Sequence, residues 1–214
     1  MNAYVFTFCG TLCHALPSGA LYLPDQNLLC VSDLHLGKSD RIARRSGVML
    51  PPYEVIATLD KLAEDLAATD ARQVICLGDS FDDLAAADSL DEAMRLRLTS
   101  LQAGRDWIWV EGNHDPGPVD LGGSHLAQVQ IGPLTFRHIA TQAQAEISGH
   151  YHPKFRLAGR SRPAFVLDRD RMILPAYGAY TGGLDCTQPV IRQHFGPTAH
   201  AILTGRKAIV VPLP

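Results

Sequence analysis

Polar motifs follow apolar, strand-like runs at five points along the chain, and this arrangement restricts the folds open to it. Each motif supplies carboxylate, amide or imidazole groups at the point where a predicted strand ends. Layered α/β proteins build their ligand loops at such strand ends. The five motifs are residues 31–35 (VSDLH), 78–83 (GDSFDD), 112–115 (GNHD), His138 alone, and 149–152 (GHYH).

The first half of the chain alternates between two patterns. Three short apolar runs end in ligand loops, as buried strands do: residues 28–32, 73–77 and 107–110. Residues 53–68, introduced by Pro51 and Pro52, carry apolar side chains at helical spacing. Residues 83–103 are rich in alanine and leucine and favour a helix. The alternation predicts parallel strands joined by helices.

The second half is different, because its apolar residues alternate with polar ones in short runs separated by turn signals. These runs are residues 126–131, 134–138, 165–167, 172–174 and 208–211. Their spacing predicts hairpins that form a second sheet. No repeat or Pro/Ser-rich linker divides the chain, so we expect residues 1–214 to form one domain of two packed sheets with helices outside.

Charge and cysteine content exclude some classes of protein. A net charge of −3 and a pI near 6.3 argue against coating of nucleic acid by bulk positive charge. The odd number of cysteines favours reduced core thiols in a cytoplasmic protein, and Cys9 and Cys13 lack the second pair that a structural zinc site needs. The first residues are not typical of a signal peptide, and no apolar run could span a bilayer. We therefore expect a cytoplasmic protein without membrane contact.

Asp33 and His35 are two residues apart, so on an extended strand end they point to the same side and can converge on one cation. Taken alone, the pair would more often be a turn acid beside a surface histidine. Asp79 follows Gly78, whose missing side chain allows a tight turn, and a single carboxylate there can bridge two ions.

The remaining motifs add amide and imidazole donors. Asn113 offers a carbonyl oxygen, whereas a lone histidine such as His138 is more often a core or surface residue than a ligand. His150 and His152 repeat the two-residue spacing, and Gly149 and Pro153 around them predict a rigid ligand loop.

Together, residues 31–35, 78–79, 112–115 and 149–152 resemble the signature of the calcineurin-like metallophosphoesterases. His138 matches the lone histidine that this family places before its last motif. A narrower likeness exists to the bacterial ligase-associated DNA damage response endonucleases. It involves residues 33–38 with the arginine-rich segment behind them, and residues 174–184. The resemblance implies an α/β fold of the four-layer αββα type, in which two packed mixed β-sheets are flanked by helices.

The resemblance also implies two divalent metal ions. The first would be held by Asp33, His35, Asp79 and His152, and the second by Asp79, Asn113, His138 and His150. Oxygen and imidazole donors without a thiolate suit manganese first, with iron or zinc as alternatives, and disfavour calcium. Two ions about 3.5 to 4 Å apart can clamp a phosphate and activate a water, so that hydroxide attacks phosphorus in line.

Two further residues would act beside the metals. By family analogy, His114 stabilises the transition state and protonates the departing oxygen, and Asp115 fixes the tautomer and orientation of His114. Alternatively, Asp115 is a helix N-cap before Pro116. At Asp82, many relatives carry histidine; this acid either tightens metal binding or caps the helix that follows.

Four cations follow the first ligand loop and are candidates for contact with substrate: Lys38, Arg41, Arg44 and Arg45. Basic runs are usually solvated helix faces, but their position favours binding of the phosphates that flank a scissile bond. Tyr151, Tyr177 and Tyr180 could stack bases; Tyr177 and Tyr180, near glycines and a proline, are more typical of loop packing.

From these residues and the resemblance, we expect a metal-dependent phosphodiesterase that acts as a DNA endonuclease in DNA repair, on single-stranded or flap-like DNA. The likeness implies a functional link to a helicase, an exonuclease and an ATP-dependent DNA ligase. A small-molecule phosphoesterase acting on nucleotides or lipid-sugar pyrophosphates is the alternative enzyme. A non-catalytic scaffold is the alternative of another class, although such relics usually lose ligand histidines or the His114 position, which are present here.

Overall fold

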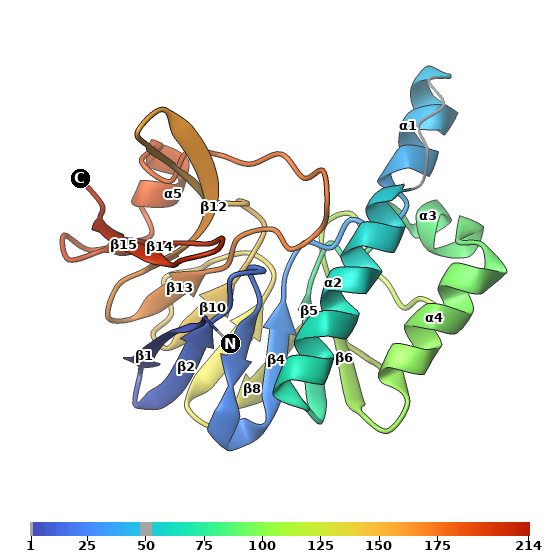
Figure 1. Ribbon diagram of the computed structural model, residues 1–214, viewed down its shortest axis with the longest axis horizontal. Coiled ribbons are helices and arrows are strands. Elements are labelled where there is room, and N and C mark those ends of the chain that lie inside the picture. The colour runs from blue at the N-terminus through green and yellow to red at the C-terminus, as the bar shows by residue number, and fades with distance from the viewer. Residues whose placement is uncertain (1, 48–52) are drawn as a thin grey trace.

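The computed structural model describes residues 2–47 and 53–214 and contains two β-sheets packed face to face (Figure 1). The first sheet has seven strands in chain order, antiparallel from β1 to β4 and parallel from β4 to β7. Its strands are β1 (Tyr4–Phe8), β2 (Thr11–Ala15), β3 (Leu21–Leu23), β4 (Leu28–Val31), β5 (Gln73–Leu77), β6 (Asp106–Val110) and β7 (Ser124–Leu126). The predicted parallel strands lie at its centre.

The second sheet has the order β15-β14-β12-β13-β10-β9-β8, and β11 pairs with β12 alone. β10 is parallel to β9 and β13, and the other pairings are antiparallel, so this sheet is also mixed. Its strands are β8 (Gln128–Ile131), β9 (Leu134–Arg137), β10 (Glu146–Ser148), β11 (Lys154–Leu157), β12 (Arg160–Leu167), β13 (Arg171–Ile173), β14 (His200–Leu203) and β15 (Ile209–Pro212).

The central strands are buried on both faces, which explains why they are continuously apolar in sequence. In β4, Leu28 and Cys30 face the second sheet, whereas Leu29 and Val31 face the helices. The core between the sheets therefore receives alternate residues of every central strand. From the second sheet it receives side chains such as Phe136 of β9.

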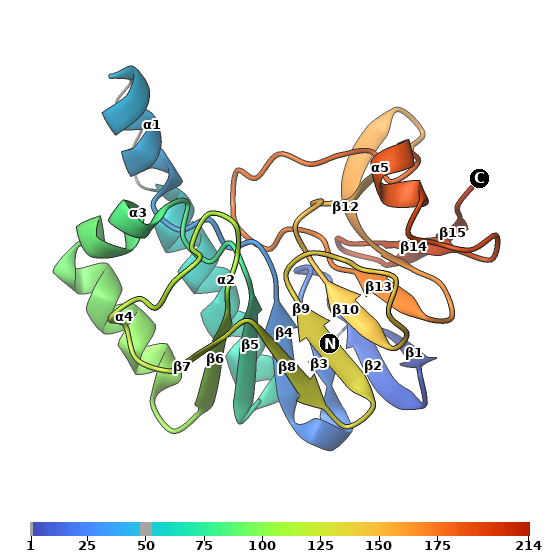
Figure 2. The same ribbon diagram turned by 180° about the vertical axis from the view of Figure 1, so that it is seen from behind.

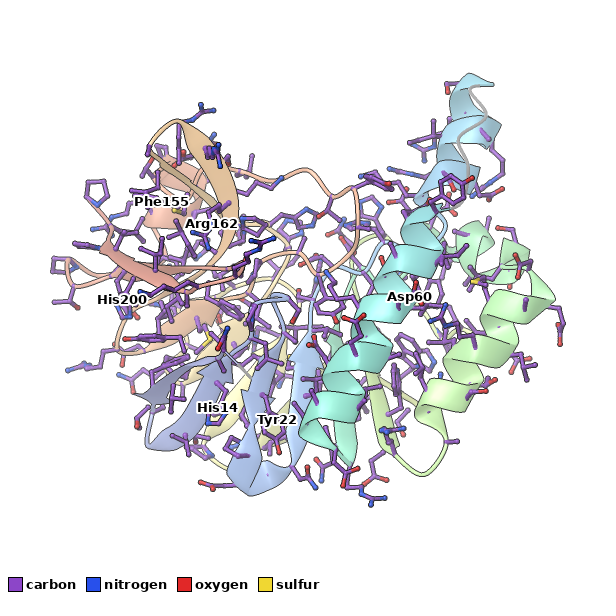
Figure 3. The ribbon with its side chains drawn as sticks, in the orientation of Figure 1. His14, Tyr22, Asp60, Phe155, Arg162 and His200 are labelled. Atoms are coloured by element: carbon purple, nitrogen blue, oxygen red, sulfur yellow. The ribbon has the colours of Figure 1, made fainter. Side chains whose placement is uncertain are left out.

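Helices form the outer layers (Figures 1 and 2). The helices are α1 (Lys38–Ser46), α2 (Tyr53–Thr69), α3 (Leu84–Ser89), α4 (Glu92–Gln102), α5 (Pro189–Arg192) and the short 3₁₀ helix η1 (Pro24–Gln26). α2 and α4 cover the first sheet. Asp60 lies on α2 (Figure 3), and its ion pair with Arg97 of α4 joins the two helices. α5 and its neighbouring chain cover the outer face of the second sheet through Ile191 and Phe195. The αββα layering is thus confirmed, with a thin fourth layer.

Two predicted elements are divided in the structure. Residues 83–103 form two helices. Leu90 leaves the helical conformation, with φ of −55° and ψ of 130°, and Asp91 then caps α4 because its side chain accepts from the backbone N–H of Met94. Residues 126–131 were predicted as one strand, but β7 ends at Leu126 in the first sheet and β8 begins in the second, with Ala127 between them. The predicted role of Pro51 and Pro52 lies outside the described residues.

No helix in the described part of the chain is long and apolar enough to cross a membrane. The five cysteines all lie within this part, and each is a free thiol. Four of them are buried, and Cys9 is half-buried.

Candidate active site

The ligand loops converge because strands from both sheets end at the same edge. β4, β5 and β6 are parallel neighbours, so Asp33, Asp79 and Asn113 follow adjacent strand ends. β9 and β10 are also parallel, and their ends lead to His138 and His150. The carboxyl ends of these five strands therefore bring together residues that are up to 117 positions apart.

Two glycines permit this close approach. A Cβ on Gly149 would lie 1.8 Å from Oγ of Ser32, and a Cβ on Gly78 would lie 2.3 Å from Nδ1 of His138. Both distances are far below a possible contact. The loop of one sheet can thus lie against a ligand of the other only because these positions lack side chains.

The first cluster of ligand-type groups consists of Asp33, His35 and His152. Nε2 of His152 lies 3.2 Å from Oδ1 of Asp33 and 3.2 Å from Nε2 of His35. The Asp33 carboxylate is fully buried and accepts from Oγ of Ser32 at 2.5 Å and from the backbone N–H of His150 at 3.0 Å. One ligand atom from each member lies within 4.8 Å of the others.

The second cluster consists of Asp79, Asn113, His138 and His150. Nε2 of His138 lies 3.0 Å from Oδ1 of Asn113, 3.2 Å from Nδ1 of His150 and 3.3 Å from Oδ2 of Asp79. On its other side, Nδ1 of His138 lies 3.0 Å from the carbonyl of Leu77, which accepts its proton. In the neutral ring, Nε2 of His138 is therefore unprotonated, and it faces the other ligand-type atoms of the cluster.

Asp79 lies between the clusters. Its Oδ2 is 3.3 Å from His138 of the second cluster and 4.0 Å from Nε2 of His35 of the first. Burial raises the pKa of Asp79, but the contact with His138 and the charge of that ring outweigh it and hold this pKa at about 2. Burial lowers the pKa of His138, and the same contact with Asp79 raises it above its usual value. The pair thus favours an ionised carboxylate between the clusters.

Five of the predicted ligands have left-handed backbone conformations, which non-glycine residues adopt rarely. Such conformations persist only where the surrounding structure fixes them, and they cluster at functional sites. The residues, with their φ angles, are Asp33 (54°), His35 (47°), Asp79 (47°), His150 (70°) and His152 (47°).

Asp82 supports His35. Its Oδ1 lies 2.9 Å from Nδ1 of His35, and its Oδ2 contacts Nε of Arg41. A carboxylate at this place favours a proton on Nδ1 of His35, which leaves Nε2 free toward His152. Helix capping falls to the next residue instead, because the Asp83 side chain accepts from the backbone N–H of Ala86 at the start of α3. Asp82 therefore does not cap α3, and its effect on metal binding stays a prediction.

His114 is a member of neither cluster, but it lies beside them and forms a further group of ligand-type atoms with His35 and Asp82, all within 4.8 Å of one another. Its Nδ1 is 2.8 Å from the carbonyl of Asp82, and its Nε2 is 4.0 Å from Oδ2 of Asp79. The backbone carbonyl of Asp82 thus orients the ring. It turns Nε2 toward the space in front of Asp79.

Asp115 has a different role from either one expected. Its carboxylate accepts from the backbone N–H groups of Asp79, Ser80, Phe81 and Gly112 at 2.8 to 3.1 Å, and no helix begins at Pro116. It therefore ties the Asp79 loop to the Asn113 loop, and the assignment to the tautomer of His114 or to a helix cap was wrong. Burial raises the pKa of Asp115 to about 6, although these amide donors lower it.

The donor set suits divalent cations. Nε2 of His35 and of His152 lie 3.2 Å apart, and two ring nitrogens at this separation require a proton or a cation between them. The clusters contain carboxylate, amide and imidazole donors and no thiolate, which is a set typical of first-row transition metals. Asp33, His35 and His152 could hold one ion and Asn113, His138 and His150 another, with Asp79 between them.

The predicted substrate residues on α1 differ in their contacts. Arg41 is paired with Asp82, and Arg44 is paired with Asp40 at 2.9 Å and with Asp83 at 2.8 Å. Arg45 is exposed and has no hydrogen-bond or ion-pair partner among the described residues. Two of the four cations are thus already neutralised, and contact of any of them with substrate stays a prediction.

Tyr151 is half-buried, and its hydroxyl lies 3.0 Å from Nε2 of His194. Its ring meets those of His150 and His194 at centroid distances of 5.0 and 5.2 Å. These contacts hold the ring beside the ligand loop 149–152. Base stacking by Tyr151 stays a prediction.

Sequence reasoning missed a support behind the first cluster. Lys61 of α2 donates to the carbonyl of Tyr177, and the Tyr177 hydroxyl donates to Asp65 at 2.8 Å. The backbone N–H of Tyr177 in turn donates to the carbonyl of Ser32 at 2.7 Å. Thr58, Lys61 and Asp65 recur at helical spacing, and this polar stripe was the signal available in the sequence.

Comparison with known proteins agrees with this geometry. Residues 27–187 match the family described as calcineurin-like phosphoesterase. The chain is also similar to the crystal structure of the Pseudomonas putida nuclease MPE, with 27% sequence identity and a TM-score of 0.78 over 99% of this chain and 100% of that one. No curated protein sequence matches the chain.

Proposed function

Because the chain belongs to the calcineurin-like phosphoesterase family, we propose that it is a metal-dependent phosphodiesterase that cleaves DNA by using two divalent ions. The observation that carries the proposal is the position of Asp79, whose Oδ2 lies 3.3 Å from a ligand-type nitrogen of one cluster and 4.0 Å from that of the other. One carboxylate placed in this way can serve two ions. When bound, divalent ions supply Lewis acidity toward a phosphoryl group and lower the pKa of water.

The residues of the chain supply the remaining parts of the reaction. His114 is held by the carbonyl of Asp82 through Nδ1, so a proton on Nε2 would face a departing oxygen in front of Asp79. Arg45, and Lys38 at the start of α1, provide positive charge for phosphates that flank the scissile bond. Manganese is the metal we expect to support activity best, given the mixed oxygen and imidazole donors.

A nucleic-acid substrate is supported by two observations. The first is the likeness to a protein described as a nuclease. The second is an open cleft of about 320 Å³ beside the second cluster, lined among others by Asn113, His138 and Arg137. This cleft is continuous with the ligand-type residues and leaves space beside them for a chain of nucleotides. Its lining offers no net positive charge, because Arg137 is paired with Glu146 and Glu111 also lies there. A role in DNA repair alongside a helicase, an exonuclease and a ligase is the biological setting we propose.

The test is a metal-supplemented assay of the 214-residue chain after removal of bound metal by a chelator. We expect manganese to restore cleavage of single-stranded DNA and of an aryl phosphodiester, with weaker hydrolysis of an aryl phosphomonoester. Full activity in chelator, or with calcium alone, would rule out the proposed chemistry. Hydrolysis of the small esters without any cleavage of DNA would favour the small-molecule phosphoesterase. Metal binding without hydrolysis of any of the three would favour the scaffold.

A further inference from the structure

The chain from Tyr177 to Leu184 crosses between two basic elements at the edge where the ligand loops meet. Figures 1 and 2 show the segment between β13 and α5 passing from the side of α2 toward α5, at the end of the molecule from which α1 projects. Its beginning rests on the first cluster, because the backbone N–H of Gly178 donates to the carbonyl of Asp33 at 3.1 Å. The backbone N–H of Ala179 donates to Oγ1 of Thr58 at 2.9 Å.

A lysine lies on each side of this segment. Nζ of Lys38, at the start of α1, donates to the carbonyl of Tyr180 at 3.4 Å. Nζ of Lys154, at the start of β11, donates to the carbonyl of Thr181 at 3.2 Å. Lys154 also follows the ligand His152 by two residues. Two cations from distant parts of the sequence thus flank Tyr180, close to the ligand loops.

Tyr180 and Tyr177 differ sharply in exposure. Tyr177 is fully buried, and its hydroxyl is bonded to Asp65. The side chain of Tyr180 is 75% exposed and has no hydrogen-bond or ring partner in the described residues, and its backbone is left-handed with φ of 58°. The flanking bonds of Gly178, Ala179 and Lys154 hold this conformation. A large aromatic ring is thereby presented to solvent on a segment that is fixed at both ends.

We propose that Tyr180 is a stacking platform for a nucleobase of a single-stranded nucleic acid, and that Lys38 and Lys154 bind the phosphates on either side of that base. Exposed aromatic rings set among cations are how proteins bind single strands without sequence preference, because every base has a π-face. The inference rests on the proposed function and names the parts of the substrate that the protein contacts, one nucleobase and the phosphates on either side of it. Tyr180 follows Gly178 by two residues, and the backbone N–H of Gly178 donates to Asp33 of the first cluster, so the base bound by Tyr180 lies close to that cluster.

The base dependence of cleavage tests this assignment. Two strands of equal length would be compared, one of ordinary single-stranded DNA and one in which tetrahydrofuran residues replace every nucleoside, so that phosphates remain and bases are absent. We expect Tyr180→Ala to lower kcat/KM for the ordinary strand by about 5- to 150-fold and to leave the base-free strand within about twofold of wild type. Tyr180→Phe should keep most of the wild-type value, because it retains the ring. Tyr53→Ala, at another tyrosine that is 63% exposed, is the matched control and should change neither substrate.

The outcomes separate this inference from the proposed function. If wild type cleaves both strands and Tyr180→Ala weakens both equally, the tyrosine only supports the loop and the inference is wrong. Unchanged cleavage of both strands by Tyr180→Ala also overturns it, as does an equal loss in Tyr53→Ala. If wild type with manganese cleaves neither strand, the proposed function itself fails.

Discussion

The two ligand clusters are held in different ways. In the second cluster, His138 is fixed by a main-chain carbonyl, that of Leu77, at the end of β5. In the first cluster, His35 depends on the side chain of Asp82, and the Asp33 loop depends on amides of Tyr177 and Gly178. The support of the second cluster is a main-chain group of the central sheet, whereas that of the first cluster includes the side chain of Asp82, which a single substitution can remove. The first cluster should therefore be the more sensitive of the two.

Replacing Asp79 removes the carboxylate that lies between the two clusters and should have the largest effect. We expect Asp79→Ala to lose most bound metal and to lower phosphodiester cleavage on the order of 1,000-fold or more, since metal ions contribute several kcal/mol to such reactions. Elemental analysis and steady-state assays measure the two losses. Asp91→Ala, which removes only the cap of α4, is the control. Retention of both ions would show that the clusters are independent of Asp79.

His114 belongs to neither cluster, so its loss should leave both intact. His114→Ala should lower kcat on the order of 100- to 10,000-fold, as expected for a general acid, with metal content unchanged. His200→Ala on β14 serves as the control (Figure 3). A loss of metal equal to that of Asp79→Ala would mean that His114 is a ligand.

Asp82→Asn tests the difference between the clusters directly. Loss of the charge beside His35 should weaken one of two metal-binding steps by about 10- to 100-fold and leave the other unchanged, because residues behind a ligand typically have effects of this size. A calorimetric metal titration resolves the two steps. Asp83→Asn, one residue further along, alters only the cap of α3 and an ion pair with Arg44 and is the matched control. Equal weakening of both steps would contradict the comparison.

Lys61 lies behind the first cluster, and its contribution to the free energy of unfolding should depend on pH. Burial lowers the pKa of Lys61 to about 8, against 10.5 for an unburied lysine. Between these values the unfolded chain binds more protons than the native one, so the free energy of unfolding rises with pH in this window. Below about pH 8 both states are charged, and the contribution is flat.

Comparison with Lys61→Met isolates this effect. The stability of wild type relative to Lys61→Met should increase by about 2 kcal/mol from pH 7.5 to 9.5, measured by urea unfolding of chelated protein. Lys207→Met, at an exposed lysine, should show no such trend. A constant difference across the range would mean that Lys61 keeps its proton in the native state.

The smallest effect concerns two arginines of α1. Arg41 contacts Asp82, whereas Arg45 is exposed without a partner in the described residues. Arg41→Gln should weaken the same metal step as Asp82→Asn, by only about 2- to 5-fold, because a partly exposed ion pair contributes little. Arg45→Gln should leave metal binding unchanged. If both variants behave alike in the titration, the link from α1 to His35 is not functional.

Elements with a strong local pattern of apolar residues could be predicted from the sequence, and elements without such a pattern could not. β4, β5 and β6 are buried on both faces, so their apolar runs were visible, and the ligand loops after them could be located from the strand ends. β10 has three residues and contains the buried acid Glu146, which contacts Arg137, so no apolar pattern marks it. The crossing at Ala127 was missed because a run that alternates in sequence gives no indication of which sheet each half joins.

The roles of residues behind the site could not be predicted for a related reason. Asp115 accepts from amides of residues 79–81, and Tyr177 donates to the carbonyl of Ser32; both contacts join segments far apart in sequence. Local spacing carries information only about neighbours on one element. Most ligand-type residues could be picked out because their motifs are compact, and His138 only through the family resemblance, whereas the groups that position them are scattered.

The Asp33 loop is made early in synthesis of the chain but contacts residues that are made much later. Asp33 accepts from the backbone N–H of His150, 117 residues later, and its carbonyl accepts from Gly178. Domains made during translation begin to fold from the N-terminus, and contacts between distant residues form late. The first ligand loop must therefore wait for most of the chain to leave the ribosome before it acquires its final conformation. The ligand-type residues of the first cluster therefore reach their final arrangement among the last events of folding, and a truncated nascent chain lacks the assembled site.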